Sequence, residues 1–373
     1  MSYKSIDTLQ KALGDSVFAH TKDSKKAAGR ALGTLIEIIT FYLLKEWKMT
    51  NHISIERKLA EYGNPSITHN VEFTLHPLLK KEVFDIAFSK NLGSKTIAKA
   101  IGLKDNFVIK GKNIIDSKLT IKNSCVIAEN DSHIIVSNTD SIKDKIASIT
   151  TCWLMTKPYA MVECKRVGVE DGNKKGPQTI EKAKQGAYVA QTTSSLQKIR
   201  NDKGQKYGII YKDGCPIIKP YTELLEEIIQ SNDPQLLNDF TLSIGIVSNH
   251  GNWFTSEDQN KELKVLAQSY DWLLFLTDEG LSQFITDLLL EPSKENQAVQ
   301  LAFLDSYKEG KKENIFTKSR ISFAAHCALS QYFSRHISEI ESWFNVISPM
   351  SGSLQSLKTI LRNLANKKKE DCI

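Results

Sequence analysis

The chain has few of the features that mark disulfide-rich, membrane-spanning or disordered proteins. Its 6 cysteines are scattered without a Cys-x-x-Cys pair, which argues against a zinc knuckle or a dense disulfide framework and favours a reduced, cytoplasmic protein. Only 9 of 373 residues are proline and 41% are hydrophobic, so long disordered linkers are not expected. The N-terminus lacks the apolar core of a signal peptide, and the apolar stretch 31–44 is short and interrupted by Glu37. No membrane span is therefore expected.

Length and charge set wide limits. A formal net charge of +6 is compatible with a polyanionic partner but does not require one. The length is sufficient for one elaborated domain or two. We expect a core over residues 1–256 with an inserted subregion at about 89–150, followed by a mostly helical region, 257–373, that can pack on the core as one domain.

Hydrophobic periodicity predicts the main elements. Helical spacing of apolar residues predicts a long amphipathic helix over residues 25–47 and a second helix over 54–62. Short β-rich runs predict a pair of strands at 71–75 and 83–88. Further predictions are a helix starting near 141, a strand from 160, a helix over 178–200, a hairpin over 207–218, a helix over 221–231 and a strand over 240–247. The helices expected in the C-terminal region are 260–276, 281–290, 298–307, 321–344 and 354–364. The pattern indicates an α/β (α+β) protein with a mixed sheet flanked by helices.

Residues 159–188 contain the clearest chemical signal. An apolar run over 160–162 enters a strand that carries Glu163 and Lys165 two residues apart, hence on one face. A loop rich in glycine and lysine follows, and Gly176-Pro177 then opens a helical pattern. A carboxylate and an ammonium at a strand end, next to a basic helix start, suggest a metal ion acting on a phosphate.

A second acid is needed to hold such an ion. Asp85 lies in a run that is apolar on both sides, where an isolated buried carboxylate would be costly unless it were paired or bound to a metal. Two carboxylates can hold Mg²⁺ (or Mn²⁺), and a lysine can orient the nucleophile or share the charge of the phosphate. Asp85 and Glu163 are 78 positions apart, so the intervening insertion must loop out and return if they are to meet.

These residues resemble the PD-(D/E)XK nuclease superfamily, and in particular its type II restriction endonucleases. The resemblance covers about residues 25–247 and is strongest over 160–188. It implies a restriction-endonuclease-like core in which Asp85 and Glu163 bind Mg²⁺ and Lys165 lies beside the scissile phosphate. Glu37, on an early helix, would join them as a further metal ligand. It also implies a homodimer that cuts double-stranded DNA at a short specific sequence.

The sequence departs from the family pattern around the first acid. Phe84 stands where the family usually has proline, and the spacing from Asp85 to Glu163 exceeds the familiar hairpin. Asp140 is the main alternative and Asp116 a weaker one. Asp85 is preferred because strand-like residues flank it, whereas Asp140 resembles a helix cap.

Basic residues concentrate around the Glu-x-Lys strand. Residues 161–200 contain eight basic side chains against four acids. On the helix that follows, three polar side chains fall at positions i, i+4 and i+7, with two lysines just ahead of its N-terminus, where a phosphate would be attracted. The candidate DNA contacts are Lys174, Lys175, Gln178, Lys182 and Gln185. The 89–150 insertion is a second place where sequence could be read.

Two other functions stay open. One is a structure-specific DNA repair or recombination nuclease of the same superfamily. The other is a non-catalytic DNA-binding protein, because a Glu-x-Lys at a strand end is often only a solvated salt bridge.

Overall fold

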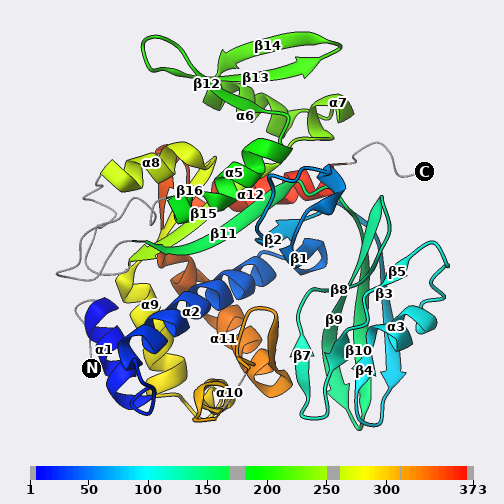
Figure 1. Ribbon diagram of the computed structural model, residues 1–373, viewed down its shortest axis with the longest axis vertical. Coiled ribbons are helices and arrows are strands. Elements are labelled where there is room, and N and C mark those ends of the chain that lie inside the picture. The colour runs from blue at the N-terminus through cyan, green and yellow to red at the C-terminus, as the bar shows by residue number, and fades with distance from the viewer. Residues whose placement is uncertain (1–5, 168–180, 250–260, 311–312, 368–373) are drawn as a thin grey trace.

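A six-stranded mixed sheet forms the centre of the protein, as a computed structural model shows for residues 6–167, 181–249, 261–310 and 313–367 (Figure 1). In spatial order its strands are β1 (Ile53–Arg57), β2 (Val71–Leu75), β11 (Ala160–Val167), β15 (Leu242–Asn249), β16 (Trp272–Leu276) and β18 (Phe344–Ser348). The strands β11, β15 and β16 are parallel, and the other neighbours are antiparallel. The predicted mixed α/β class, with a mixed sheet flanked by helices, is confirmed.

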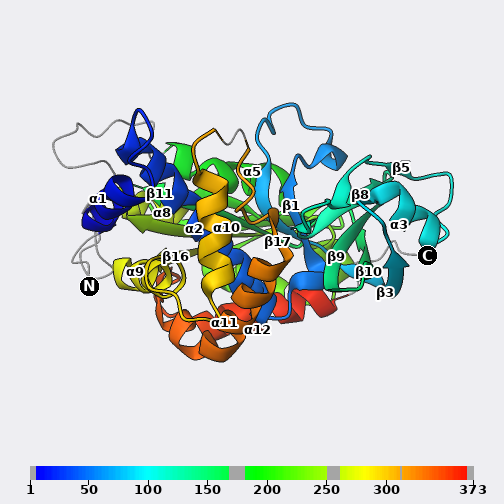
Figure 2. The same cartoon turned by 90° about the horizontal axis from the view of Figure 1, so that it is seen from below.

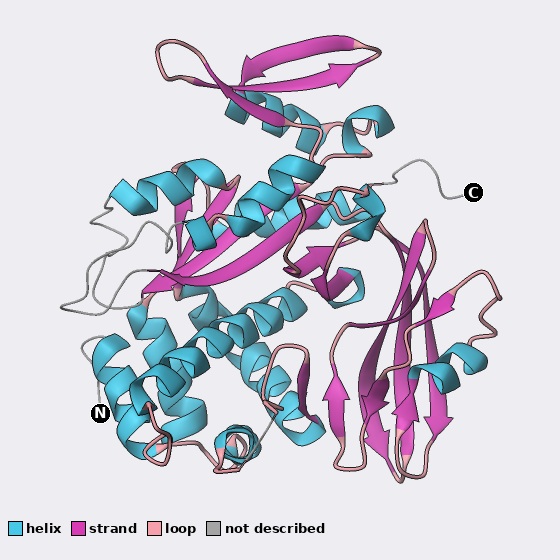
Figure 3. Cartoon of the chain, in the orientation of Figure 1, coloured by secondary structure: helices cyan, strands magenta, loops and turns pink. Residues whose placement is uncertain are grey.

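Helices cover both faces of this sheet (Figure 3). The parallel strands β15 and β16 are buried along their whole length, as expected for strands with covered faces. On one face lies α2 (Ser24–Glu46), which confirms the predicted helix over 25–47. Its N-cap residue Asp23 accepts a hydrogen bond from the backbone N–H of Lys26.

The apolar character of α2 reflects its position in the core. The helix is long and apolar enough to cross a membrane, but 67% of its most apolar window is buried inside the protein. It packs against α1 (Ile6–Ser16), α11 (Phe323–Ser342) and β11. The other face of the sheet carries α5 (Gln185–Thr193), which contacts β11 and β15. The last four residues of the helix expected over 178–200 are instead strand β12 (Gln197–Arg200).

An insertion separates β2 from β11 in sequence but not in space. The chain leaves the central sheet after Leu75 and returns at Ala160, and these two residues are paired across the antiparallel strands. Residues 76–159 therefore loop out, over a longer span than the expected 89–150. They build most of two further sheets, seen to the right of the central sheet in Figure 1.

The insertion is mainly β-structure. A five-stranded antiparallel sheet has the order β3-β10-β9-β8-β5, and a four-stranded sheet has the order β17-β7-β6-β4. The elements are β3 (Leu78–Ala87), β4 (Leu92–Gly93), α3 (Ser94–Ala100), β5 (Val108–Ile109), β6 (Asn113–Ile115), β7 (Thr120–Lys122), β8 (Cys125–Glu129), β9 (His133–Lys143) and β10 (Ile146–Met155). The strand β17 (Arg320–Ser322) comes from the C-terminal region.

Three local predictions in this part of the chain are wrong. The runs 71–75 and 83–88 are strands but do not pair, because β2 pairs with β1 and β11 whereas β3 pairs with β10. The expected helix over 54–62 is strand β1 followed by the short 3₁₀ helix η2 (Ala60–Tyr62). The helix expected near 141 is the end of β9. In each case pairing between strands overrides the local pattern.

The C-terminal region is helical but also completes the central sheet. Its helices are α8 (Lys261–Ser269), α9 (Asp278–Ile285), the π-helical η3 (Thr286–Leu290), α10 (Gln297–Tyr307), α11 and α12 (Leu354–Asn366). The last five residues of the helix expected over 260–276 are instead the fully buried strand β16. Figure 2 shows α10 and α11 in front of α2, and the contacts between α11 and α2 join this region to the N-terminal helices.

A small outer unit carries the predicted hairpin. The strands β13 (Lys206–Lys212) and β14 (Cys215–Pro220) turn at Asp213-Gly214, where both φ angles are positive, as in a two-residue hairpin turn. The helices α6 (Tyr221–Gln230) and α7 (Pro234–Leu237) follow, at the top of Figure 1.

Candidate active site

Three glutamates lie next to paired residues of the strands β1, β2 and β11. The pairs Ile55↔Phe73 and Phe73↔Val162 fix the register, and each of Glu56, Glu72 and Glu163 is one position away from a residue of these pairs. The sheet thus gathers carboxylates from positions more than 90 residues apart.

Glu72 and Glu163 are fixed by reciprocal hydrogen bonds to the backbone. The N–H of Glu72 donates to Oε1 of Glu163 at 3.1 Å, and the N–H of Cys164 donates to Oε2 of Glu72 at 2.9 Å. The backbone hydrogen bonds between β2 and β11 end at this point. The two carboxylates therefore accept hydrogen bonds from backbone N–H groups that would otherwise have no partner. Both side chains are buried, Glu163 to 1% exposure.

Lys165 joins the two carboxylates. Its Nζ lies 2.8 Å from Oε1 of Glu72 and 3.3 Å from Oε2 of Glu163. Nε2 of His69, in the segment before β2, lies 3.0 Å from Oε1 of Glu163. Oε2 of Glu163 is buried and accepts no hydrogen bond from the described residues. Two buried acids therefore share one lysine, and Oε2 of Glu163 has the ammonium of Lys165 as its neighbouring charge.

The electrostatics of the three groups differ. Burial, and then the charge of Glu163, raise the pKa of Glu72 to about 7. Burial also opposes ionisation of Glu163, but the hydrogen bond with His69 and the charge of Lys165 outweigh it and lower the pKa of that carboxyl. Burial would lower the pKa of Lys165, but the two carboxylates raise it instead. Glu163 and Lys165 are therefore charged at neutral pH, whereas burial and the charge of Glu163 oppose ionisation of Glu72.

Helix α5 closes over Glu163 through a glycine. A Cβ atom on Gly186 would lie 2.0 Å from Cγ and 2.8 Å from Cβ of Glu163. On the opposite face of β11, Sγ of Cys164 lies 3.2 Å from Oγ1 of Thr40 in α2. The two helices thus clamp the strand end from its two faces, and only glycine fits at position 186.

A second lysine lies on the other side of Glu72. Lys318 is 3% exposed, and its Nζ lies 2.7 Å from Oε2 of Glu37 and 3.5 Å from Oε1 of Glu56. It also lies 5.6 Å from the ring centroid of Phe73. Burial would lower the pKa of Lys318, but Glu72 and Glu37 raise it. The charges of Lys318 and Glu37 both act on Glu72.

Glu56 is held in a strained conformation at this point. Its φ of 55° is in the left-handed region, which costs about 1–2 kcal/mol for a residue other than glycine. Glu56 is the one residue within β1 that has no partner in β2, although its neighbours Ile55 and Arg57 are paired. The distortion brings its carboxylate within reach of Lys318.

The structure brings together some of the residues that the sequence singled out. Glu163 and Lys165 lie in contact at the end of β11, and Glu37 lies nearby through Lys318. Asp85 is not part of this group. It is exposed in β3, the edge strand of the five-stranded sheet, opposite Ser148. The expectation that Asp85 meets Glu163 is wrong, because β3 belongs to the insertion and an exposed carboxylate on an edge strand needs no partner.

The two alternative acids are also elsewhere. Asp140 is an exposed residue of β9 that accepts a hydrogen bond from Thr150 at 2.5 Å. It does not cap a helix. Asp116 accepts hydrogen bonds from the N–H groups of Lys118 and Thr120, as an acid does in a tight turn.

The predicted DNA contacts are described only in part. Lys174, Lys175 and Gln178 lie outside the described residues. Lys182 and Gln185 line a hollow of about 530 Å³ together with His69, the residue that contacts Glu163. The start of α5 and His69 thus line one hollow, and His69 connects that hollow to Glu163.

A hard metal ion fits the chemistry of the two carboxylates. Among the described residues, no three His, Cys, Asp or Glu side chains form a ready group of metal ligands. Glu72 and Glu163 nevertheless converge on one cation, the ammonium of Lys165, and no described residue donates a hydrogen bond to Oε2 of Glu163. Mg²⁺ is commonly bound by one or two carboxylates, with water and phosphate oxygens completing its shell. Glu72 and Glu163 are the residues that would hold it.

Sequence reasoning missed Glu72, His69, Glu56 and Lys318. Glu72 had a usable signal, since it is an acid inside the correctly predicted strand 71–75. Lys318 had none, because it reaches the site from 155 positions beyond Glu163. No family model, curated protein or solved structure matches this chain.

Proposed function

We propose that the protein is a Mg²⁺-dependent endonuclease that hydrolyses phosphodiester bonds of double-stranded DNA. The observation that carries the proposal is the contact of Lys165 with both Glu72 and Glu163 on neighbouring strands. In this assignment Glu72 takes the role that the sequence had suggested for Asp85. Mn²⁺ would be able to replace Mg²⁺, because both ions accept carboxylate oxygens.

Each side chain has a distinct part in the reaction. Glu72 and Glu163 would hold the ion, which supplies positive charge to the phosphate and lowers the pKa of a bound water. Lys165 stays protonated and offers its ammonium to the charge that develops on the scissile phosphate. His69 is a positioning residue that fixes the carboxylate of Glu163.

The order of elements agrees with the resemblance seen in the sequence. A helix carrying an acid, a strand with a second acid, a neighbouring strand with Glu-x-Lys, a helix and a parallel strand follow one another as α2, β2, β11, α5 and β15. The chain differs from the family in having Glu72 in place of the usual aspartate, preceded by Val71. We therefore favour a type II restriction endonuclease that acts as a homodimer.

Incubation of plasmid DNA with the purified protein tests the proposal. With Mg²⁺ or Mn²⁺ we expect a fixed set of fragments, and with EDTA we expect intact plasmid. A smear of products would support nuclease activity but contradict sequence-specific cutting, and it would favour a structure-specific enzyme. A gel shift without cutting under any metal would reject the nuclease and indicate a non-catalytic DNA-binding protein.

A further inference from the structure

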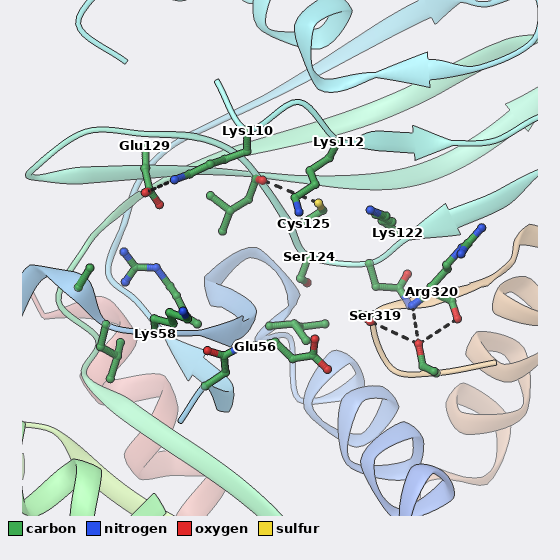
Figure 4. Close-up of a pocket in the computed structure, with 18 of the residues that line it drawn as sticks. Glu56, Lys58, Lys110, Lys112, Lys122, Ser124, Cys125, Glu129, Ser319 and Arg320 are labelled. Carbon is green, nitrogen blue, oxygen red and sulfur yellow. Dashed lines mark hydrogen bonds and ion pairs between the residues drawn. The ribbon is translucent and has the colours of Figure 1, made fainter. Parts of the chain in front are cut away.

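A cleft opens between the central sheet and the insertion (Figure 4). Its volume is about 730 Å³. One wall is the end of β1 and the residues after it, including Glu56 and Lys58, and the opposite wall carries Lys110, Lys112 and Lys122 of the insertion. A segment of the C-terminal region, with Ser319 and Arg320, forms a third side.

The lining of this cleft is strongly basic. It contains six cationic side chains and only two acidic ones, Glu56 and Glu129. The cationic residues are Arg57, Lys58, Lys110, Lys112, Lys122 and Arg320. Within the described parts of the chain, Lys58, Lys112 and Lys122 have no acidic partner within 4.0 Å. By contrast, Arg57 is paired with Glu61, Lys110 with Glu129, and Arg320 with Asp116 and Glu313.

Glu56 and the residues on both sides of Lys318 connect the cleft to the candidate active site. Glu56 lines it and lies 3.5 Å from Lys318, whose charge acts on Glu72. Thr317 and Ser319, the two neighbours of Lys318 in sequence, also line it. A chain of phosphates lying along the lysines would therefore approach the acids of the central sheet.

The walls are held together by hydrogen bonds. Asn123 donates from Nδ2 to the carbonyl oxygen of Lys318 at 3.0 Å, and its backbone N–H donates to that of Ser319 at 3.1 Å. The strand β17 pairs with β7 so that Arg320 stands opposite Lys122. The positive charges are thus positioned before any partner arrives, which reduces the ordering cost of binding.

We propose that this cleft binds the sugar-phosphate backbone of double-stranded DNA and guides it to Glu72 and Glu163. The proposal rests on the proposed function and deepens it by giving the insertion the role of a DNA clamp. Lysines spread over three separate segments suit a polymer of phosphates better than a single phosphate, which would need its donors to converge on one point. Unpaired lysines are the side chains that release counterions on binding DNA.

The test compares two triple variants of the full chain. In the cleft variant, Lys58→Ala, Lys112→Ala and Lys122→Ala remove the three unpaired charges. In the control variant, Lys95→Ala, Lys99→Ala and Lys104→Ala remove three exposed lysines of the insertion that do not line the cleft. Fluorescence anisotropy with a labelled duplex in EDTA measures binding without hydrolysis, and circular dichroism with thermal melting checks that both variants are folded.

We expect the cleft variant to bind roughly a hundredfold more weakly at 0.15 M salt, at roughly fivefold for each lysine. The slope of log K against log salt should become shallower by about 2.7, since each lysine contributes about 0.9. The control variant should lose much less affinity. Equal losses in the two variants, or an unchanged affinity in the cleft variant, would overturn the proposal. So would wild-type protein that binds heparin but not duplex DNA.

Cleavage measured separately distinguishes the two proposals. If wild-type protein cuts DNA and the cleft variant cuts it with unchanged KM, the proposed DNA-binding role of the cleft is rejected and the proposed nuclease activity is kept. If wild-type protein binds duplex DNA through the cleft lysines but never cuts it, the nuclease activity is rejected and the DNA-binding role of the cleft is kept.

Discussion

Glu72 and Asp85 are two acids in similar stretches of sequence that the fold treats in opposite ways. Each lies in a short run of mainly apolar residues, thirteen positions apart. Glu72 is in β2, whose five residues are all buried between β1 and β11. Asp85 is in β3, an edge strand where Val83 is 55% exposed and Asp85 itself is exposed. The flanking residues alone do not tell these environments apart.

The difference lies in which strands stand beside each acid. The neighbours of Glu72 include β11, which follows it in sequence only after the insertion has looped out and returned. The neighbour of Asp85 is β10, another strand of that insertion. The strand β2 lies between two other strands of the central sheet, so Glu72 is buried beside Lys165. The strand β3 is at a sheet edge, so Asp85 is exposed to water. Function is therefore expected at Glu72 and not at Asp85.

The largest expected effect is on cleavage by the acid variants. Glu72→Gln, Glu163→Gln and Lys165→Ala should each reduce the rate of plasmid cleavage by at least about a hundredfold, because each removes a charge that acts on the metal or the phosphate. Asp85→Asn should cut at the wild-type rate. Single-turnover cleavage assays measure all four. Loss of cleavage in Asp85→Asn, with full activity in Glu72→Gln, would show that Asp85 and not Glu72 is the catalytic acid.

A second test uses glycine to alanine substitutions on two helices. In Gly186→Ala the new Cβ would collide with the side chain of Glu163, so we expect a loss of about 1–3 kcal/mol in the free energy of unfolding and a large fall in cleavage. In Gly33→Ala, on α2, the new Cβ meets nothing within 4 Å, so stability should be unchanged or rise by up to about 1 kcal/mol. Urea unfolding and cleavage assays compare the two. Equal behaviour would show that α5 does not press on Glu163.

Much of the fold could be predicted from local patterns. The helix α2, the strands β2 and β15 and the hairpin of β13 and β14 follow from periodicity and turn residues within each segment. The Glu-x-Lys of β11 could likewise be singled out, since both residues are on one strand. These features depend on contacts close in sequence, which a pattern can encode.

The rest of the site depends on long-range pairing. The register of β2 against β11 decides that Glu72, and not Asp85, faces Glu163, and that register is fixed across an 84-residue insertion from 76 to 159. Lys318 reaches Glu37 across 281 positions. β16 looked like part of a helix because a buried parallel strand is apolar throughout and has no alternation. None of these relations leaves a periodic trace in the sequence.

A smaller effect is expected in the pH dependence of stability. Because the pKa of Glu72 is raised from 4.5 to about 7, the folded protein binds more protons than the unfolded chain between these values. This contribution is complete below pH 4.5 and is lost as pH rises through about 7. The size of this contribution to the free energy of unfolding is on the order of 3 kcal/mol. In EDTA, the free energy of unfolding of wild-type protein minus that of Glu72→Gln should thus fall between pH 5 and 8.

Because both proteins contain the same other titrating groups, taking the difference between their free energies of unfolding cancels the contributions of those groups. His326, whose pKa is lowered to about 3 mainly by burial, gives stability that rises with pH below about 6.5, in the opposite direction. A flat difference for Glu72→Gln would mean that burial in β2 does not shift the pKa of Glu72.

The smallest effect expected is stabilisation by the metal. Mg²⁺ that binds the folded chain alone at ten times its Kd should add about 1.4 kcal/mol to the free energy of unfolding and raise Tm by a few degrees. Glu163→Gln and Glu72→Gln should lose this increase, and Asp85→Asn should keep it. The increase should also be larger at pH 8 than at pH 6, because the ion requires Glu72 in its ionised form. Thermal melts need no DNA and no cleavage, so a shift that persists in Glu163→Gln would place the metal elsewhere even if the protein cuts.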